Sequence, residues 1–290
     1  MAPPGTRRRL DPVLGLGVAP GVLFLMVFFA LPMTVVGAYS FLEPSASGQV
    51  DASLTLANYR QVFDPLYAAV LLRSAALALA TTALSLLVSF PAALAIRGME
   101  RRRQALLMAL LIIPSWMNLL VKNYAWMVIL RRQGVLNTAL LSLGVTQAPL
   151  SLLFNPWAVL IGLVHTYLPF MLLPLYVALE RLDWTQVEAA RDLSAGPWQT
   201  FERVILPQTQ GGVLVGCTLV FIPALGAFIT PDLLGGPESL MVGTLVESQV
   251  LQVRNWPFAS ALSASLMALV VAALVATRRV VARQAGGELL

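Results

Sequence analysis

The sequence is poor in charged side chains and has almost no cysteine. Only 11% of its 290 residues are Asp, Glu, Lys or Arg, whereas 58% are hydrophobic. A soluble domain carries roughly one-quarter charged residues, so the composition predicts a membrane protein. Cys217 is the single cysteine, which excludes an intrachain disulfide. It lies in an apolar run, where a thiol packs as a small side chain.

The scarcity of lysine and histidine limits the chemistry of the chain. Lys122 is the only lysine, and no glycine lies beside it, so the sequence holds no Walker A loop for a nucleotide phosphate. His165 is the only histidine, which excludes the two-histidine zinc motif HExxH. A bond from His165 to a neighbouring helix is the ordinary interpretation, with a proton relay as the alternative. We expect no catalytic residue, no metal site and no cofactor bound by this chain.

Six long apolar segments follow one another along the chain. They are residues 13–39, 74–96, 104–130, 154–179, 211–234 and 258–277. Each has about the ~20 residues needed to cross some 30 Å of hydrocarbon. We therefore expect an all-α integral membrane protein with six transmembrane helices in one domain, 13–280, between polar tails at 1–12 and 281–290. The loop between the first two spans is expected to carry a short helix near residues 56–63.

Arginines are distributed unevenly between the two sides of the predicted membrane. Thirteen lie in the N-terminal tail, the 97–103 turn, the 181–203 region and the C-terminal tail, against four in the opposite loops. The positive-inside rule therefore places both termini and the loop 181–210 in the cytoplasm. Topology also explains the net charge of +5, so we expect no nucleic-acid partner.

The longest charge-bearing stretch between two apolar segments runs from Thr185 to Pro207. Thr185 and Glu188 have the spacing of a capping box at a helix start. Residues 194–196 are expected to interrupt that helix, and Pro197 suits the first position of a second one. Pro207 is expected to end the second helix, because the residue before a proline avoids the helical region. The stretch predicts a bent pair of amphipathic helices outside the membrane.

The same stretch resembles the EAA loop of binding-protein-dependent ABC import permeases. That pattern is EAA, three residues, Gly, nine residues, Ile, any residue, Leu-Pro, and residues 188–190 and 206–207 fit it without gaps. Ser194 stands where the glycine is expected, and Val204 where the isoleucine is expected. Gly196 is expected to supply a flexible break nearby. The alternative interpretation is an ordinary capped cytoplasmic linker.

The resemblance implies the type I fold of ABC importer permeases, in the inner membrane of a bacterium. It also implies three kinds of protein partner in addition to the lipid bilayer. These are a dimer of ATPase subunits that binds the ATP and Mg²⁺, a second permease subunit that completes a heterodimer, and a periplasmic solute-binding protein. The residues that would couple this chain to the ATPase are Glu188, Ala189, Ala190, Arg191, Asp192, Gly196 and Pro197. Glu188 would be a charged contact or brace, the alanines would permit close approach, and the Gly-Pro pair would set the bend.

Two further regions resemble permeases that import spermidine and putrescine. They are residues 120–126 with 134–137, and residues 226–237 with 255–258. The resemblance extends from about residue 13 to 280 and implies a polyamine as the solute. The residues it suggests for the substrate path are Asp232, Lys122, Trp116, Tyr124 and Trp126.

Each substrate-path assignment has an ordinary alternative. Asp232 is hypothesised to guide the cation and to pair with Lys122 when the path is empty, or else to be a helix-end cap. The aromatic side chains are expected to line the cavity, or else to lie at the membrane interface. Glu238 and Glu247 are expected to be solvated or to face the binding protein.

Other functions remain open at this stage. The solute of the importer is a polyamine or another small molecule, such as an amino-acid derivative, an opine or a phosphonate. An ion-coupled secondary transporter would need charged residues in mid-span, for which Lys122 is the clearest candidate. A membrane scaffold or receptor would bind a partner through Thr185–Pro207 and transport nothing. The cytoplasmic loop favours the importer, because it offers an ATPase a surface to bind.

Overall fold

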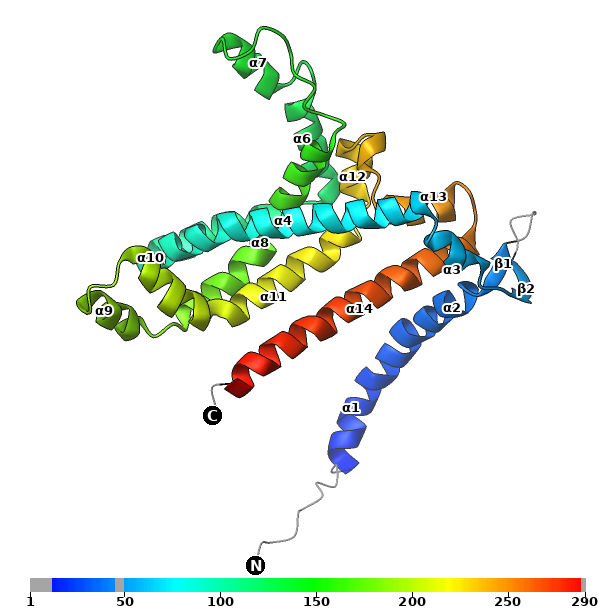
Figure 1. Cartoon of the computed structure of the whole chain (residues 1–290), viewed down its shortest axis with the longest axis horizontal. Coiled ribbons are helices and arrows are strands. Elements are labelled where there is room, and N and C mark those ends of the chain that lie inside the picture. The colour runs from blue at the N-terminus through cyan, green and yellow to red at the C-terminus, as the bar shows by residue number, and fades with distance from the viewer. Residues whose placement is uncertain (1–11, 45–49, 288–290) are drawn as a thin grey trace, which may run out of the picture.

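The computed structural model describes residues 12–44 and 50–287, most of which are helical (Figure 1). Four described helices are long and apolar enough to cross a membrane, and a bent pair makes a fifth span if its two helices count as one. Residues 1–11 of the predicted N-terminal tail and residues 288–290 lie outside the described residues.

Three long helices lie side by side and form the core of the molecule. They are α4 (Pro65–Arg97), α8 (Pro156–Glu180) and α11 (Leu206–Leu225) (Figure 1). A Cβ atom on Gly212 would lie 2.5 Å from the Cβ of Ala178, and one on Gly216 would lie 2.7 Å from the Sδ of Met171. The two glycines therefore let α11 approach α8 closely. Membrane helices associate through such contacts at small residues, because lipid provides no hydrophobic driving force between them.

The first and last helices lie beside one another outside this core. The described part of the chain starts with α1 (Pro12–Leu25), a π-helical turn (Met26–Ala30) and α2 (Leu31–Tyr39), which together match the predicted first span. α14 (Trp256–Gly287) packs against α2 and contains the predicted sixth span. The described apolar part of α14 covers only Trp256–Ala272.

The predicted third span is bent rather than straight. Residues 104–130 divide between α5 (Arg101–Ser115) and α6 (Leu119–Leu130), and α7 (Val135–Ser142) continues α6. The two parts meet at an angle of 93°. Asn118 starts the second part, because its side-chain oxygen accepts a hydrogen bond from the Leu120 N–H at 2.8 Å. The prediction of one continuous helix is wrong at this point.

The predicted fifth span is also displaced. α10 (Pro197–Thr200), a π-helical turn η2 (Phe201–Ile205) and α11 form one helix from Pro197 to Leu225. Pro207 therefore does not end the second helix of the loop, and that prediction is wrong. The wide turn just before it accommodates a proline, which lacks an N–H and clashes with the preceding turn. After α11 the chain breaks and continues as α12 (Ile229–Leu234), a 3₁₀ turn η3 (Pro237–Ser239) and α13 (Val242–Leu251).

The two ends of the core carry different structures (Figure 1). At one end lie α9 (Trp184–Asp192) and α10. At the other lie α13, α3 (Ala57–Val62) and a hairpin of β1 (Leu42–Pro44) and β2 (Val50–Leu54), paired antiparallel. α3 is the short helix predicted near residues 56–63, whereas the hairpin was not predicted from the sequence.

Candidate coupling surface and substrate path

α9 begins with a capped turn. The Asp183 carboxylate accepts hydrogen bonds from the Thr185 hydroxyl at 2.7 Å and from the Thr185 N–H at 3.1 Å. Both bonds lower the pKa of the Asp183 carboxyl, and the bond from the Thr185 hydroxyl has the larger effect. The predicted capping box of Thr185 and Glu188 is wrong, because Asp183 is the cap and Thr185 already lies inside the helix. An aspartate just before Trp184 was the signal for this start.

One face of α9 is anchored and the opposite face is exposed. Val187 is only 1% exposed and belongs to a core cluster with Leu179, Ile205 and Phe90, which come from α8, η2 and α4. Burying such a side chain contributes about 1.5–3 kcal/mol. The predicted coupling residues Glu188, Ala189, Arg191 and Asp192 are exposed, and Ala190 is half-buried. The structure therefore presents most of the EAA-like residues to solvent on a helix that is fixed from behind.

α9 ends in a Schellman motif. The Ala195 N–H donates to the Ala190 carbonyl at 3.0 Å, and the Ser194 N–H donates to the Arg191 carbonyl at 2.8 Å. These are the two bonds that close such a motif. The residue directly after the helix C-cap adopts the left-handed conformation in it. Here that residue is Ser194, with a φ of 63°. The motif explains why the family pattern has glycine at this position.

Gly196 follows the left-handed turn with an extended backbone. Its φ of −65° and ψ of 162° are extended values open to any residue, and a Cβ atom there would meet nothing within 4 Å. Ser194, and not Gly196, makes the left-handed turn. Pro197 occupies the first turn of α10, as predicted, and the Gln199 side chain accepts a hydrogen bond from the Gly196 N–H at 3.2 Å.

Two side-chain contacts join α9 to the ends of α11 and α4. The Gln208 amide of α11 donates to the Gln186 side chain at 2.9 Å. The Arg97 guanidinium, at the end of α4, lies 5.6 Å from the centre of the Trp184 ring, within the range of a cation–π interaction. A displacement of α9 would therefore be transmitted to α4 and α11.

A buried glutamine fixes the turn between α4 and α5. The Gln104 amide donates to the carbonyls of Arg97 at 3.0 Å and Met99 at 2.7 Å. Its oxygen accepts a hydrogen bond from the Tyr176 hydroxyl of α8 at 2.9 Å. This link was missed from the sequence, since a lone glutamine in a basic turn carries no pattern.

The predicted substrate-path residues come from the α5–α6 bend, from α6 and from α12. Lys122 is 9% exposed, and its ammonium donates to the Ser115 carbonyl at 3.4 Å, across the bend between α5 and α6. Asp232 is exposed on α12. Trp126 lies edge-on to His165 of α8, with ring centres 5.7 Å apart. The remaining two aromatic residues, Trp116 and Tyr124, are 84% and 54% exposed.

A close junction of α6, α8 and α12 was also missed from the sequence. The buried Asn123 amide donates to the Thr230 hydroxyl at 3.2 Å, which joins α6 to α12. A Cβ atom on Gly162 of α8 would lie 2.6 Å from the Cδ1 of Leu234 and 2.8 Å from the Cγ2 of Thr230. Gly162 therefore leaves the space that α12 fills. No sequence pattern links a glycine to a helix some 70 residues further along the chain.

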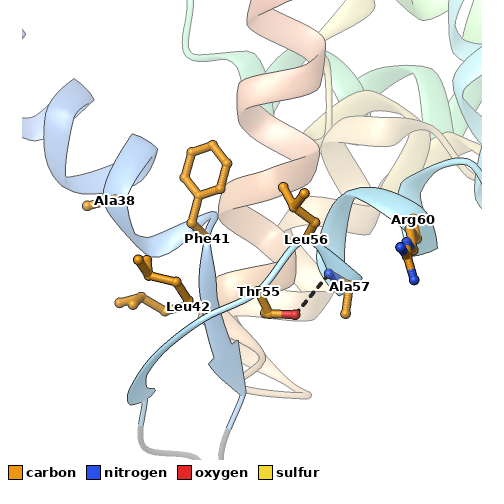
Figure 2. Close-up of a pocket in the computed structure, with 8 residues that line it drawn as sticks. Ala38, Phe41, Leu42, Thr55, Leu56, Ala57 and Arg60 are labelled. Atoms are coloured by element: carbon orange, nitrogen blue, oxygen red, sulfur yellow. Dashed lines mark hydrogen bonds between the residues drawn. The ribbon is translucent and has the colours of Figure 1, made fainter.

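Two cavities lie toward the end of the molecule opposite α9. One, of about 770 Å³, is lined by α2, the hairpin and α3 (Figure 2). Phe41 and Leu56 point to the same side there, and the Thr55 hydroxyl accepts a hydrogen bond from the Ala57 N–H at 3.1 Å. The other, of about 620 Å³, lies between α2, α11, α13 and α14. In the described part of the chain, no group of three His, Cys, Asp or Glu side chains is placed to hold a metal ion.

The chain combines membrane-length helices with a short, anchored amphipathic helix at one end, as expected of the membrane subunit of a transport system. The family model described as "Binding-protein-dependent transport system inner membrane component" matches residues 85–284. The chain belongs to this family and is a multi-pass inner-membrane permease subunit of an ABC transporter.

Several proteins of this family are similar to the chain over most of its length. The spermidine/putrescine transport system permease protein PotB of Haemophilus influenzae is 43% identical over 85% of this chain and 86% of its own. PotB of Escherichia coli K12 is 42% identical over 84% of this chain and 88% of its own. The inner membrane ABC transporter permease protein YdcU of the same organism is 33% identical over 93% and 90%.

Solved structures of transporters share the fold. A bacterial ABC transporter involved in the import of the acidic polysaccharide alginate matches with a TM-score of 0.67 and 18% identity, over 93% of this chain and 96% of that one. The alginate transporter in complex with its alginate pentasaccharide-bound periplasmic protein matches with a TM-score of 0.68 and 18% identity, over 92% and 93%. At this identity the likeness supports the fold alone.

Proposed function

We propose that the chain is one of two permease subunits of an ATP-driven importer of polyamines. The assignment of a polyamine as the solute rests on one observation. The chain is 42–43% identical to proteins named as spermidine/putrescine permeases, over more than four-fifths of both chains. The chain itself binds no cofactor in this proposal. ATP and Mg²⁺ are bound and ATP is hydrolysed by a dimer of separate ATPase subunits, and a second permease completes the path.

The proposed topology has six transmembrane helices and both termini in the cytoplasm. The bent pair α5–α6 supplies the third crossing, and α14 supplies the sixth. The arginine distribution supports this orientation, which puts α9 on the cytoplasmic side. The hairpin, α3 and the cavity of Figure 2 then face the periplasm, where the solute-binding protein delivers its ligand.

In this proposal the exposed face of α9 docks on the ATPase. Glu188, Arg191 and Asp192 supply charged contacts, and the small side chains of Ala189 and Ala190 permit close approach. Gly196 and Pro197 set the direction in which the chain leaves the turn. Support comes from the anchoring of α9 through Val187 and from its links to α4 and α11. Closure of the ATPase would then move the cytoplasmic ends of the core helices together.

The substrate path is proposed to include Lys122, Asp232, Trp116, Tyr124 and Trp126. The exposed Asp232 would attract the cation at the periplasmic side, and exposed Trp116 and Tyr124 would offer aromatic faces to an ammonium group. Lys122 would lie behind them, held by the Ser115 carbonyl.

Uptake by the assembled transporter tests this function. The transporter is purified through a tag on this chain, reconstituted in vesicles, and given labelled putrescine or spermidine with its binding protein. Accumulation that needs both ATP and the binding protein is the expected result. If the binding protein stimulates the ATPase but no polyamine accumulates, the assignment as an importer stands and the assignment of the solute is wrong. Absence of both would contradict the assignment as an ATP-driven importer.

A further inference from the structure

The cavity between α2, α11, α13 and α14 has the size and walls of a small-molecule site. Its volume of about 620 Å³ falls within the roughly 300–1,000 Å³ typical of ligand pockets. Apolar side chains from all four helices line it, including Met33, Ile222, Val246 and Met267. Such walls suit a hydrocarbon chain, and thioethers adapt to ligands of different shape.

One carboxylate lies in this apolar lining. Glu247 of α13 is the only acidic or basic residue among the described residues that line the cavity, and Ser263 of α14 adds a hydroxyl group. Glu247 is half-buried. The sequence led us to expect Glu247 to be solvated or to face the binding protein, and the structure adds that Glu247 lies on a cavity wall. A carboxylate in an apolar cavity favours a cationic ligand over an anionic one.

The broken end of α11 adds partial negative charge to the same cavity. α11 ends at Leu225, and its C-terminal cap Gly226 lines the cavity with open space where a Cβ atom would be. The C-terminal end of a helix carries partial negative charge and favours cations. Broken membrane helices use such ends to bind cations.

A second glycine brings α13 against this helix end. A Cβ atom on Gly243 would lie 2.6 Å from the carbonyl oxygens of both Gly226 and Ala227. Gly243 therefore lets α13 pack directly against the break. Glu247 follows four residues later on the same face of α13, and both residues line the cavity.

We propose that this cavity binds one alkylammonium end of the transported cation, with Glu247 as its counter-charge. The methylene chain of the ligand lies along the methionine and aliphatic walls, and the ammonium group lies between the Glu247 carboxylate and the C-terminal end of α11. This inference rests on the proposed polyamine function and assigns a site to it. Lys122 and Asp232 do not line this cavity, so the site is separate from the path residues on α6 and α12.

Binding and transport by matched variants test the proposal. Equilibrium binding of labelled spermidine is measured on the assembled transporter in nanodiscs without the binding protein, together with the maximal uptake rate in vesicles. Glu247→Gln removes the charge at nearly constant volume. Glu43→Gln is its control, because Glu43 is exposed on β1 and the new amide can still accept the hydrogen bond that Ser53 donates at 3.0 Å. Ala264→Leu fills the cavity without a charge change, and Ala268→Leu is the control on an exposed position of the same helix.

Glu247→Gln is expected to weaken spermidine binding roughly tenfold or more, since it removes a charge-assisted bond. It lowers maximal uptake as well, while the binding protein still stimulates the ATPase. Ala264→Leu weakens binding too, and both controls behave as the unmodified protein. Equal binding by Glu247→Gln and Glu43→Gln would overturn the proposal. So would efficient cross-linking of Glu247→Cys to the second permease in the resting transporter by a maleimide that carries a photoreactive group, because a protein side chain would then fill the cavity.

Failure of the polyamine assignment can be told apart from failure of this site. If the unmodified transporter accumulates no polyamine, n-hexylamine serves as the probe and its effect on the melting temperature is measured. A rise in the unmodified protein and in Glu43→Gln, but not in Glu247→Gln, supports an alkylammonium site whatever the solute. An equal rise in all three, or in none, overturns it.

Discussion

The left-handed turn at Ser194 leads to the sharpest prediction about the coupling loop. Ser194 has a φ of 63° and closes α9 through two backbone hydrogen bonds. A residue with a Cβ atom loses about 1–2 kcal/mol in this conformation. Glycine avoids that cost but loses about 0.5–1 kcal/mol more chain entropy on folding. Ser194→Gly is therefore expected to stabilise the turn by up to about 1 kcal/mol, and Ser194→Val to destabilise it by about 1 kcal/mol or more.

Hydrogen exchange at the amides of Ser194 and Ala195 measures this turn directly. Both N–H groups close the Schellman motif, so their protection reports its opening. A change of about 1 kcal/mol corresponds to roughly fivefold in protection. Ser194→Gly is expected to raise protection by up to that factor, while Ser194→Val lowers it and reduces ATP-driven uptake.

Gly196→Ala is the matched control for the Ser194 series. Gly196 has an extended backbone and free space at its Cβ position, so alanine is expected to leave protection unchanged or slightly higher. Lower protection in Ser194→Gly, or a loss in Gly196→Ala as large as that in Ser194→Val, would refute the assignment of the turn to Ser194.

Three further predictions follow from the loop and the core. Glu188→Arg is expected to leave the protein in the membrane and to uncouple ATP hydrolysis from uptake, whereas loss of membrane insertion would point to a folding role. Gly162→Ala is expected to cost about 1–3 kcal/mol in thermal stability by forcing α12 away; the same change at Gly211, where a Cβ meets nothing within 4 Å, should cost far less. Hydrogen bonds from Thr185 lower the pKa of Asp183. The cap therefore stabilises the start of α9 fully above the usual carboxyl pKa, and this stabilisation is lost as the pH falls through the lowered pKa. Exchange protection of the Thr185 amide should fall over that acidic range, and an Asp183→Asn protein that shows the same fall would contradict this.

Composition and hydropathy predicted the helical membrane class, because apolar runs of membrane length are typical of transmembrane helices and rare in soluble folds. They did not predict the bends. The third apolar run contains Asn118, whose side chain starts a new helix in place of continuing the first. Pro207 gave the opposite error, since a proline beside a π-helical turn is tolerated within a continuous helix. The hydrophobic pattern of the sequence predicts neither the bend at Asn118 nor the continuous helix through Pro207, because each depends on a few backbone hydrogen bonds.

The EAA-like residues were found from the sequence, but their setting was not. Spacing placed Ser194 at the glycine position, and only the backbone geometry shows that this residue adopts the left-handed conformation. The cavity of Glu247 was out of reach for another reason. Its walls come from four helices whose lining residues extend from Met33 to Val270, and only packing brings Met33 and Glu247 to the same space.

Cross-linking from α9 tests the central claim, that its exposed face is the surface on which the ATPase docks. A single cysteine is placed at Ala189 in a Cys217→Ser background. The assembled transporter is treated with a short reagent that has a maleimide for the thiol and a photoreactive group for any neighbouring side chain. A cross-link to the ATPase subunit is the predicted result, with none from a cysteine at Leu54, which is 82% exposed on the hairpin at the other end of the core. A cross-link from Leu54 to the ATPase subunit would contradict the account. So would the absence of a cross-link from Ala189 to the ATPase subunit in a transporter that still imports its solute.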